Sequence, residues 1–96
     1  MKMMVERVAS FFLEKGVVAT MRSFKYTPGI VVKVKTPYGV YKGMITGVFE
    51  NTDRTRARFL EISGFDNVDE WLETATKLHG RVPPWIVVVR RIEDEV

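Results

Sequence analysis

The sequence contains no cysteine and no glutamine, and its only histidine is His79. Disulfide bonds, thiolate metal sites and histidine-rich metal sites are therefore excluded. Magnesium or calcium can bind to carboxylates alone, but no clustered aspartate pattern indicates such a site. We therefore expect neither a metal nor another cofactor. The scarcity of heat-labile side chains, beside abundant valine, lysine, arginine and glutamate, is typical of a thermophile protein.

Long apolar runs are also absent from the chain. The N-terminal segment MKMMVERVASFFLEKG is interrupted by Glu6, Arg7 and Glu14, so it lacks the continuous apolar core of a signal peptide. No other run is long enough to span a bilayer. These features predict a cytoplasmic protein with no membrane partner.

Length, composition and charge narrow the remaining possibilities. The 96 residues fit a single domain, residues 1–96, that can bury one modest hydrophobic core. Hydrophobic residues make up 46% of the chain and charged residues 28%, as in an ordinary globular protein. The net charge of +3 favours an anionic partner.

Two segments have the apolar spacing of an amphipathic helix. The first, Met4–Lys15, is predicted to end at Gly16, because glycine readily adopts the left-handed conformation that closes a helix. The second, Val68–His79, is preceded by the capping residue Asn67 and followed by Gly80. We expect the helices to pack through Val8, Phe12, Trp71, Leu72 and Leu78.

Strand-like patterns rich in β-branched residues occupy four other segments. They are Val17–Met21, Ile30–Lys35, Val40–Phe49 and Trp85–Ile92. The sequence TPYG, Thr36–Gly39, predicts a type I turn that joins the middle two strands as an antiparallel pair. In the third strand, strict alternation places Tyr41, Ile45 and Phe49 on one face together with Gly43 and Gly47.

The remaining segments are less regular. Residues 50–65 are predicted to form a loop, with a short helix or strand near Arg58–Ile62, and the acidic end Glu93–Val96 is predicted to fray. Together the elements predict an α+β domain of mostly antiparallel strands. Glycines inside a long strand favour a small, partly open barrel with two helices packed on it. A split sheet with both helices on one face is the alternative.

Four motifs stand in a fixed order between Val5 and Ile92. They are the strand ending TMR, the segment YTPGIVVKV, the segment SGFDNVDEWLETATKLHG and the strand WIVVVRRI. Their order and spacing resemble the ASCH family, a branch of the PUA-like superfamily. The resemblance implies a PUA-like pseudo-β-barrel of about five to six mostly antiparallel strands with two main helices. It also implies a cleft beside the Thr-x-Arg strand.

The sequence departs from this family at several positions. Some small bacterial members use a lysine, a threonine and a glutamate as an amidohydrolase of acetylated cytidine. Thr20 matches that threonine, but Val17 and Ser63 stand in the places of the lysine and the glutamate, and Ile30 replaces an aspartate. Because cooperating catalytic residues act as a unit, these departures favour a binding protein over an enzyme.

The candidate binding site begins with Thr20 and Arg22, which alternate around Met21 and so share one face of a strand. An arginine offers a planar fork of donors suited to phosphate or to a base edge. Nearby cations would steer the phosphates of RNA or of a nucleotide-like anionic ligand, although an ordinary solvated surface explains any one of them as well. The complete predicted set is Thr20, Arg22, Lys25, Lys42, Arg54, Arg56, Arg58 and Ser63.

Other polar and aromatic residues carry weaker signals. Ser10, Ser23 and Ser63 have no histidine near them in the sequence, and His79 has no evident partner, so a serine nucleophile is not expected. Trp85 is interpreted as the first residue of a core strand, with a stacking platform for a base as the alternative.

The sequence leaves three functions as hypotheses. RNA or nucleotide binding leads. A small amidohydrolase or nuclease with a rebuilt active site and a protein-interaction module are the alternatives.

Overall fold

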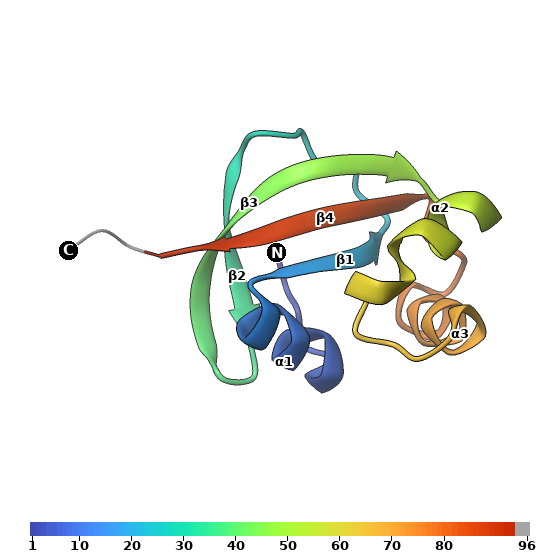
Figure 1. Cartoon of the computed structure of the whole chain (residues 1–96), viewed down its shortest axis with the longest axis horizontal. Helices are drawn as coiled ribbons and strands as arrows, with labels where there is room; N and C mark the ends of the chain where they lie inside the picture. The colour runs from blue at the N-terminus through green and yellow to red at the C-terminus, as the bar shows by residue number, and fades with distance from the viewer. Residues whose placement is uncertain (94–96) are drawn as a thin grey trace.

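A computed structural model of the chain describes residues 1–93, so most of the segment predicted to fray, residues 94–96, lies outside the described part. Its elements in chain order are α1 (Glu6–Lys15), β1 (Val17–Arg22), β2 (Val31–Thr36), β3 (Gly39–Glu50), α2 (Asp53–Phe59), the 3-10 helix η1 (Leu60–Ile62), α3 (Val68–His79) and β4 (Trp85–Ile92). Figure 1 shows a curved sheet with α1 beside β1, and with α2 and α3 gathered at one end. No helix within residues 1–93 is long and apolar enough to cross a membrane.

The sheet has four strands in the order β1-β4-β3-β2, and every neighbouring pair is antiparallel. The α+β class and the antiparallel pairing are therefore confirmed, whereas the expected count of five to six strands is wrong. The N-terminal segment adds only one isolated bridge, between Lys2 and Lys35. Residues 53–59 form a helix because the side chains of Thr52 and Thr55 cap its first turn reciprocally.

The long strand β3 changes phase at a β-bulge between Ile45 and Gly47. Ile45 pairs with Val89 and Gly47 with the adjacent Val88, so the residues after the bulge face the opposite side of the sheet. The prediction that Gly47 and Phe49 share a face with Ile45 is therefore wrong. One extra residue in a strand moves every later side chain across the sheet.

Glycine residues close both main helices as the sequence predicts. Gly16 after α1 and Gly80 after α3 each have φ of 76°, in the left-handed region that only glycine adopts easily. Helix α3 has its predicted bounds, with the Asn67 side chain accepting a hydrogen bond from the backbone of Glu70. Helix α1 begins at Glu6 rather than Met4.

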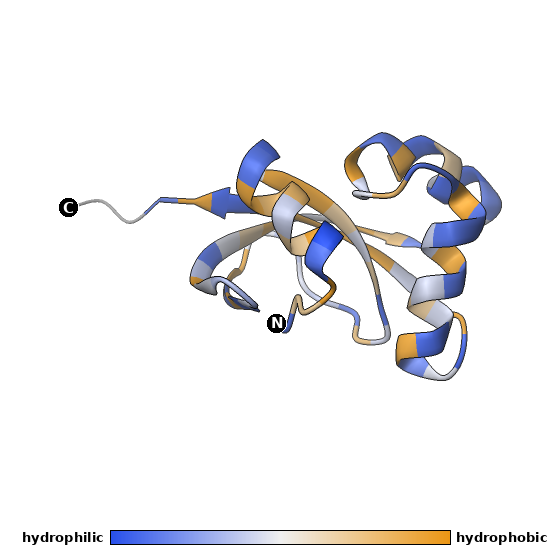
Figure 2. Cartoon of the chain, turned by 90° about the horizontal axis from the view of Figure 1, so that it is seen from below, coloured by the Kyte–Doolittle hydropathy of each residue, from blue (hydrophilic) through white to orange (hydrophobic). Residues whose placement is uncertain are grey.

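The hydrophobic core lies between the helices and the sheet, and Figure 2 shows α1 lying across the sheet. Phe12 and Trp71 are buried as predicted, while Leu72 is half-buried. Leu78 is 65% exposed, so its predicted place in the helix packing is wrong. Its turn of α3 borders an open pocket instead of the core.

Candidate functional site

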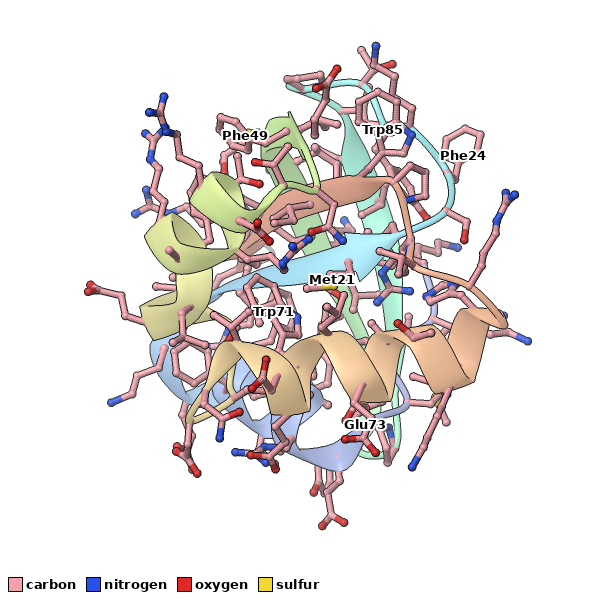
Figure 3. All side chains as sticks on the ribbon, turned by 90° about the vertical axis from the view of Figure 1, so that its right-hand side faces the viewer. Met21, Phe24, Phe49, Trp71, Glu73 and Trp85 are labelled. Carbon is pink, nitrogen blue, oxygen red and sulfur yellow. The ribbon has the colours of Figure 1, made fainter. Side chains whose placement is uncertain are left out.

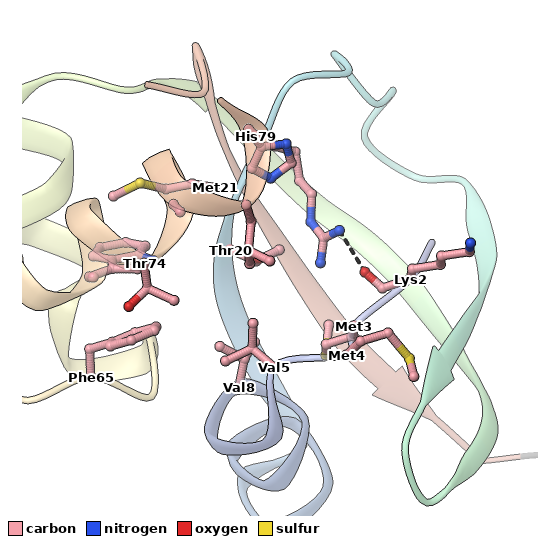
Figure 4. A pocket seen from close by; sticks show the side chains of 14 residues that line it. Lys2, Met3, Met4, Val5, Val8, Thr20, Met21, Phe65, Thr74 and His79 are labelled. Carbon is pink, nitrogen blue, oxygen red and sulfur yellow. Dashed lines mark hydrogen bonds between the residues drawn. The ribbon is translucent and has the colours of Figure 1, made fainter. Parts of the chain in front are cut away.

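A pocket of about 400 Å³ opens between the N-terminal segment, α1, β1 and α3 (Figure 4). Most of its wall is apolar, and the main apolar contributors are Met3, Val5, Val8, Phe65, Trp71 and Leu78. The polar side chains in the wall include Thr20, Arg22, Thr74 and His79. Such a pocket, mostly apolar with a few convergent polar groups, is typical of a small-molecule site.

Strand β1 brings Thr20 and Arg22 to this pocket. Alternation along the strand places both side chains on one face, and they pair across the sheet with Val87 and Trp85 of β4. Thr20 is buried, and Arg22 is partly buried at the end of the strand. Of the eight predicted site residues, Thr20 and Arg22 are the two that line this pocket.

The guanidinium of Arg22 has few partners within the protein. Its Nη1 donates a hydrogen bond of 2.6 Å to the carbonyl oxygen of Lys2, while its Nε is buried and has no hydrogen-bond partner. Within residues 1–93, no carboxylate forms an ion pair with it. Burial lowers the pKa of Arg22, and the nearby Tyr26 partly offsets this effect. A desolvated charge without a counter-charge is unfavourable, so the site favours an added anion.

His79, the last residue of α3, also lines the pocket and faces Ser23. The Ser23 hydroxyl lies 3.1 Å from Nδ1 of the imidazole. The two residues are 56 positions apart in the sequence and meet because α3 packs its last turn beside the end of β1. Burial and the charge of Arg22 lower the pKa of His79, and a hydrogen bond with the backbone of Met21 raises it. The Ser23 hydroxyl is exposed, and among the two residues of this pair only His79 lines the pocket.

The predicted lysines lie outside the pocket wall. The Lys25 ammonium sits 4.7 Å from the centre of the Trp85 ring, next to the strand position that pairs with Arg22. Lys42 is exposed on β3, where it pairs with Lys33 of β2. Lys25 is thus a neighbour of the site, and Lys42 belongs to another part of the sheet.

The three predicted arginines belong to α2 and do not line the pocket. Arg56 donates to the Asn51 side chain at 2.7 Å and pairs with Asp53, so it holds the helix in place. Arg58 lies over the rings of Phe49 and Phe59, at 5.5 and 5.0 Å from their centres. Arg54 is exposed. Of these three α2 arginines, Arg54 and Arg58 therefore present a guanidinium toward solvent.

Ser63 has a structural environment. It is fully buried, its hydroxyl donates to the Leu60 carbonyl at 2.7 Å, and it accepts from the Phe65 backbone N–H at 3.0 Å. These bonds shape the turn between η1 and α3. The hydroxyl is fully engaged there and does not face the pocket.

Sequence reasoning missed two parts of the site, the N-terminal segment and His79. The segment is placed by long-range backbone hydrogen bonds, from Met3 N–H to the Lys35 carbonyl at 2.7 Å and from Lys35 N–H to the Met1 carbonyl at 2.9 Å. No local motif predicts such pairing. For His79, the one available signal was its place at the end of an amphipathic helix.

The described residues contain no group of three or more histidine, cysteine, aspartate or glutamate side chains arranged to hold a metal ion. Comparison of the chain with known protein families, with curated protein sequences and with solved structures found no match. The resemblance to the ASCH family therefore stays a prediction.

Proposed function

We propose that this protein is a PUA-like binding module that holds RNA or a nucleotide-like anionic ligand in the pocket of Thr20 and Arg22. The observation that carries the proposal is the state of the Arg22 guanidinium. It lines a concave pocket, its Nε has no partner, and it forms no ion pair within residues 1–93. A phosphate would supply the missing counter-charge and accept paired hydrogen bonds from the guanidinium.

The rest of the pocket suits the non-phosphate part of such a ligand. Apolar side chains from α1, α3 and the N-terminal segment offer a surface for a flat base or sugar edge. The Thr20 hydroxyl, on the same strand face as Arg22, can donate or accept one orienting hydrogen bond. A desolvated guanidinium beside an apolar wall matches a ligand with an anionic group and a compact body.

The shape of the sheet supports the PUA-like part of the proposal. The N-terminal segment runs beside β2 at one edge of the curved sheet, and β1 forms the other edge. The hydrogen bond from Arg22 to Lys2 links these two edges. A sheet whose edges approach each other in this way resembles a partly open barrel.

A hydrolase with Thr20 as nucleophile finds less support. A threonine nucleophile needs a general base within hydrogen-bond reach of its hydroxyl. Val17 pairs with Arg90 at the far end of β1 and, three residues away, faces the other side of the sheet from Thr20. Ser63 is buried in its turn, and Figure 4 shows the Lys2 ammonium directed away from Thr20. Binding therefore explains the site better than hydrolysis.

The test is a titration with nucleoside monophosphates and short RNA, read by calorimetry or fluorescence polarisation. Wild-type protein should bind at low salt, and Arg22→Gln should weaken binding at least about tenfold, as expected for a charge-assisted contact. Arg81→Gln, which removes an exposed cation on the α3–β4 connection, is the control and should bind like the wild type. Absence of binding by the folded wild-type protein to both probes would overturn the proposal.

A further inference from the structure

One end of the molecule, where β1 and β3 finish and β4 begins, is rich in aromatic side chains. Figure 3 looks at this end and shows Phe49, Trp85 and Phe24 spaced along its upper edge. Phe24 follows the end of β1 and is 67% exposed, the largest exposed fraction of any large hydrophobic residue in the described chain. Isolated exposed apolar residues are common, so the neighbours of Phe24 decide whether it matters.

Those neighbours are two aromatic rings and one lysine, and together with Phe24 they form two contacting pairs. The Phe24 ring meets the Tyr26 ring edge-on, with 4.9 Å between their centres. The Lys25 ammonium lies over the Trp85 ring at 4.7 Å. We call these four residues, Phe24, Lys25, Tyr26 and Trp85, the aromatic rim.

The aromatic rim borders the pocket through Arg22. Trp85 is the cross-strand partner of Arg22, and Tyr26 is close enough to Arg22 to raise its pKa. A bound nucleic-acid strand that leaves the pocket beside the Arg22 guanidinium would therefore meet Tyr26 and Trp85 first and Phe24 beyond them. The two surfaces are adjacent parts of one end of the protein.

We propose that the aromatic rim binds the unpaired nucleotides of a single-stranded RNA, by stacking a base on Phe24 while Lys25, held over the Trp85 ring, contacts the backbone. This inference rests on the proposed function of the pocket, and it adds the class of RNA and the path of the strand. Exposed rings interleaved with cations are the elements that hold unpaired strands, because every base has a face that can stack. Bases inside a duplex are already stacked, so the rim discriminates against double-stranded RNA.

An anionic membrane is a poorer match for the same surface. Among the three rings of the rim only Phe24 is strongly exposed, and Trp85 is partly buried with an ammonium over its ring. A membrane site would present several deeply inserting apolar side chains around its cations. The rim instead offers one exposed ring and one cation held over a second ring, which fits a stacked base and a neighbouring phosphate of a strand.

The test uses fluorescence polarisation with a labelled oligouridine of about ten nucleotides, long enough to occupy the pocket and the rim. Phe24→Ala should weaken binding about tenfold, as expected for loss of one stacked base. Val40→Ala is the matched control, because Val40 is 62% exposed on β3 and lies outside the rim and the pocket wall. Phe24→Leu, which keeps apolar bulk without an aromatic face, should behave like Phe24→Ala.

Two further probes separate this inference from the proposed function. Uridine monophosphate reaches only the pocket, so its binding should be unchanged in Phe24→Ala and lost in Arg22→Gln. A duplex RNA should bind wild type and Phe24→Ala equally and weakly. Oligouridine binding that is unchanged in Phe24→Ala, or equally weakened in Val40→Ala, would overturn the proposed role of the rim and would leave the pocket proposal standing. Binding to anionic phospholipid vesicles that depends on Phe24, without such dependence for oligouridine, would assign the rim to a membrane and also overturn it.

Discussion

The Nη1 atom of Arg22 donates a 2.6 Å hydrogen bond to the carbonyl oxygen of Lys2, and this contact joins the last residue of β1 to the N-terminal segment. The same guanidinium lines the pocket and leaves its Nε without a partner. Arg22 thus has a structural contact on one side and unused donor capacity on the other. The Nε of Arg56 is also buried without a partner, but the Arg56 guanidinium pairs with Asp53, so the missing counter-charge is what distinguishes Arg22.

Arg22→Met should leave the stability nearly unchanged while abolishing nucleotide binding. The substitution loses one hydrogen bond, but it also removes a desolvated charge that has no counter-charge, and these two effects oppose each other. Thermal unfolding followed by circular dichroism measures the stability, and a nucleotide titration measures the affinity. Arg56→Met is the control, since Arg56 has partners in Asn51 and Asp53 and its loss should destabilise by about 1–3 kcal/mol. A far larger loss of stability in Arg22→Met would mean that closing the sheet edges is its main role.

Trp71→Ala should destabilise the protein by about 3–5 kcal/mol, because the ring is buried between α3 and the sheet. Leu78→Ala, in the last turn of the same helix, should cost well under about 1 kcal/mol because that side chain is exposed. Chemical denaturation of both variants measures the difference. Equal effects at the two positions would contradict the helix orientation described above.

Arg54→Gln with Arg58→Gln should reduce the salt dependence of RNA binding. If both guanidinium groups contact phosphates, the slope of log affinity against log salt should become shallower by about 1.4, and the wild-type slope should lie near −2 to −3.5 for about three to five phosphates. Arg56 is left intact because it holds α2. Lys77→Gln with Arg81→Gln makes the same change in net charge elsewhere. A slope that changes equally in both double variants would show a general charge effect without a defined contact.

The stability of the protein should fall as His79 becomes protonated. Its pKa is lowered in the folded state, chiefly by burial and then by Arg22, so the unfolded chain binds the proton more readily. The contribution of neutral His79 is complete above its unfolded pKa of about 6.5 and is lost as the pH falls through the lower folded value. Because His79 is the only histidine, its proton resonances can be titrated without overlap. His79→Gln should flatten the stability profile in this window, and an unchanged profile would contradict the assignment.

Bound phosphate should shift the titration of the same residue upward. An anion at Arg22 offsets the positive charge that lowers the pKa of His79. The imidazole resonances, followed with and without uridine monophosphate, measure this shift directly. A histidine titration that ignores saturating nucleotide would place the ligand away from the pocket.

Acetylated cytidine should not be hydrolysed above background, since Val17 and Ser63 stand in the places of the lysine and the glutamate of the amidohydrolases that the sequence resembles. Product formation by the unmodified protein, followed by chromatography, tests this directly. Turnover by wild type that disappears in Thr20→Ala would replace the binding proposal with an enzymatic one.

Local chemistry determined much of this protein from the sequence alone. Glycine after a helix, an asparagine cap and runs of β-branched residues act within a few positions, so α3 and β4 have their predicted bounds. Alternation along a strand likewise placed Thr20 and Arg22 on one face. These features need no knowledge of distant residues.

Tertiary structure decided which of the candidate residues face one another. The bulge in β3 reverses Phe49, the turn around Ser63 occupies its hydroxyl, and the Asn51 and Asp53 side chains engage Arg56. The pairing of Ser23 with His79 spans 56 positions in the sequence. Contacts of this kind arise when the whole chain packs. The most stable packing buries apolar side chains and gives hydrogen-bond partners to buried polar groups at the same time. No local pattern encodes that outcome, so the surroundings of Arg22 became visible only in the folded protein.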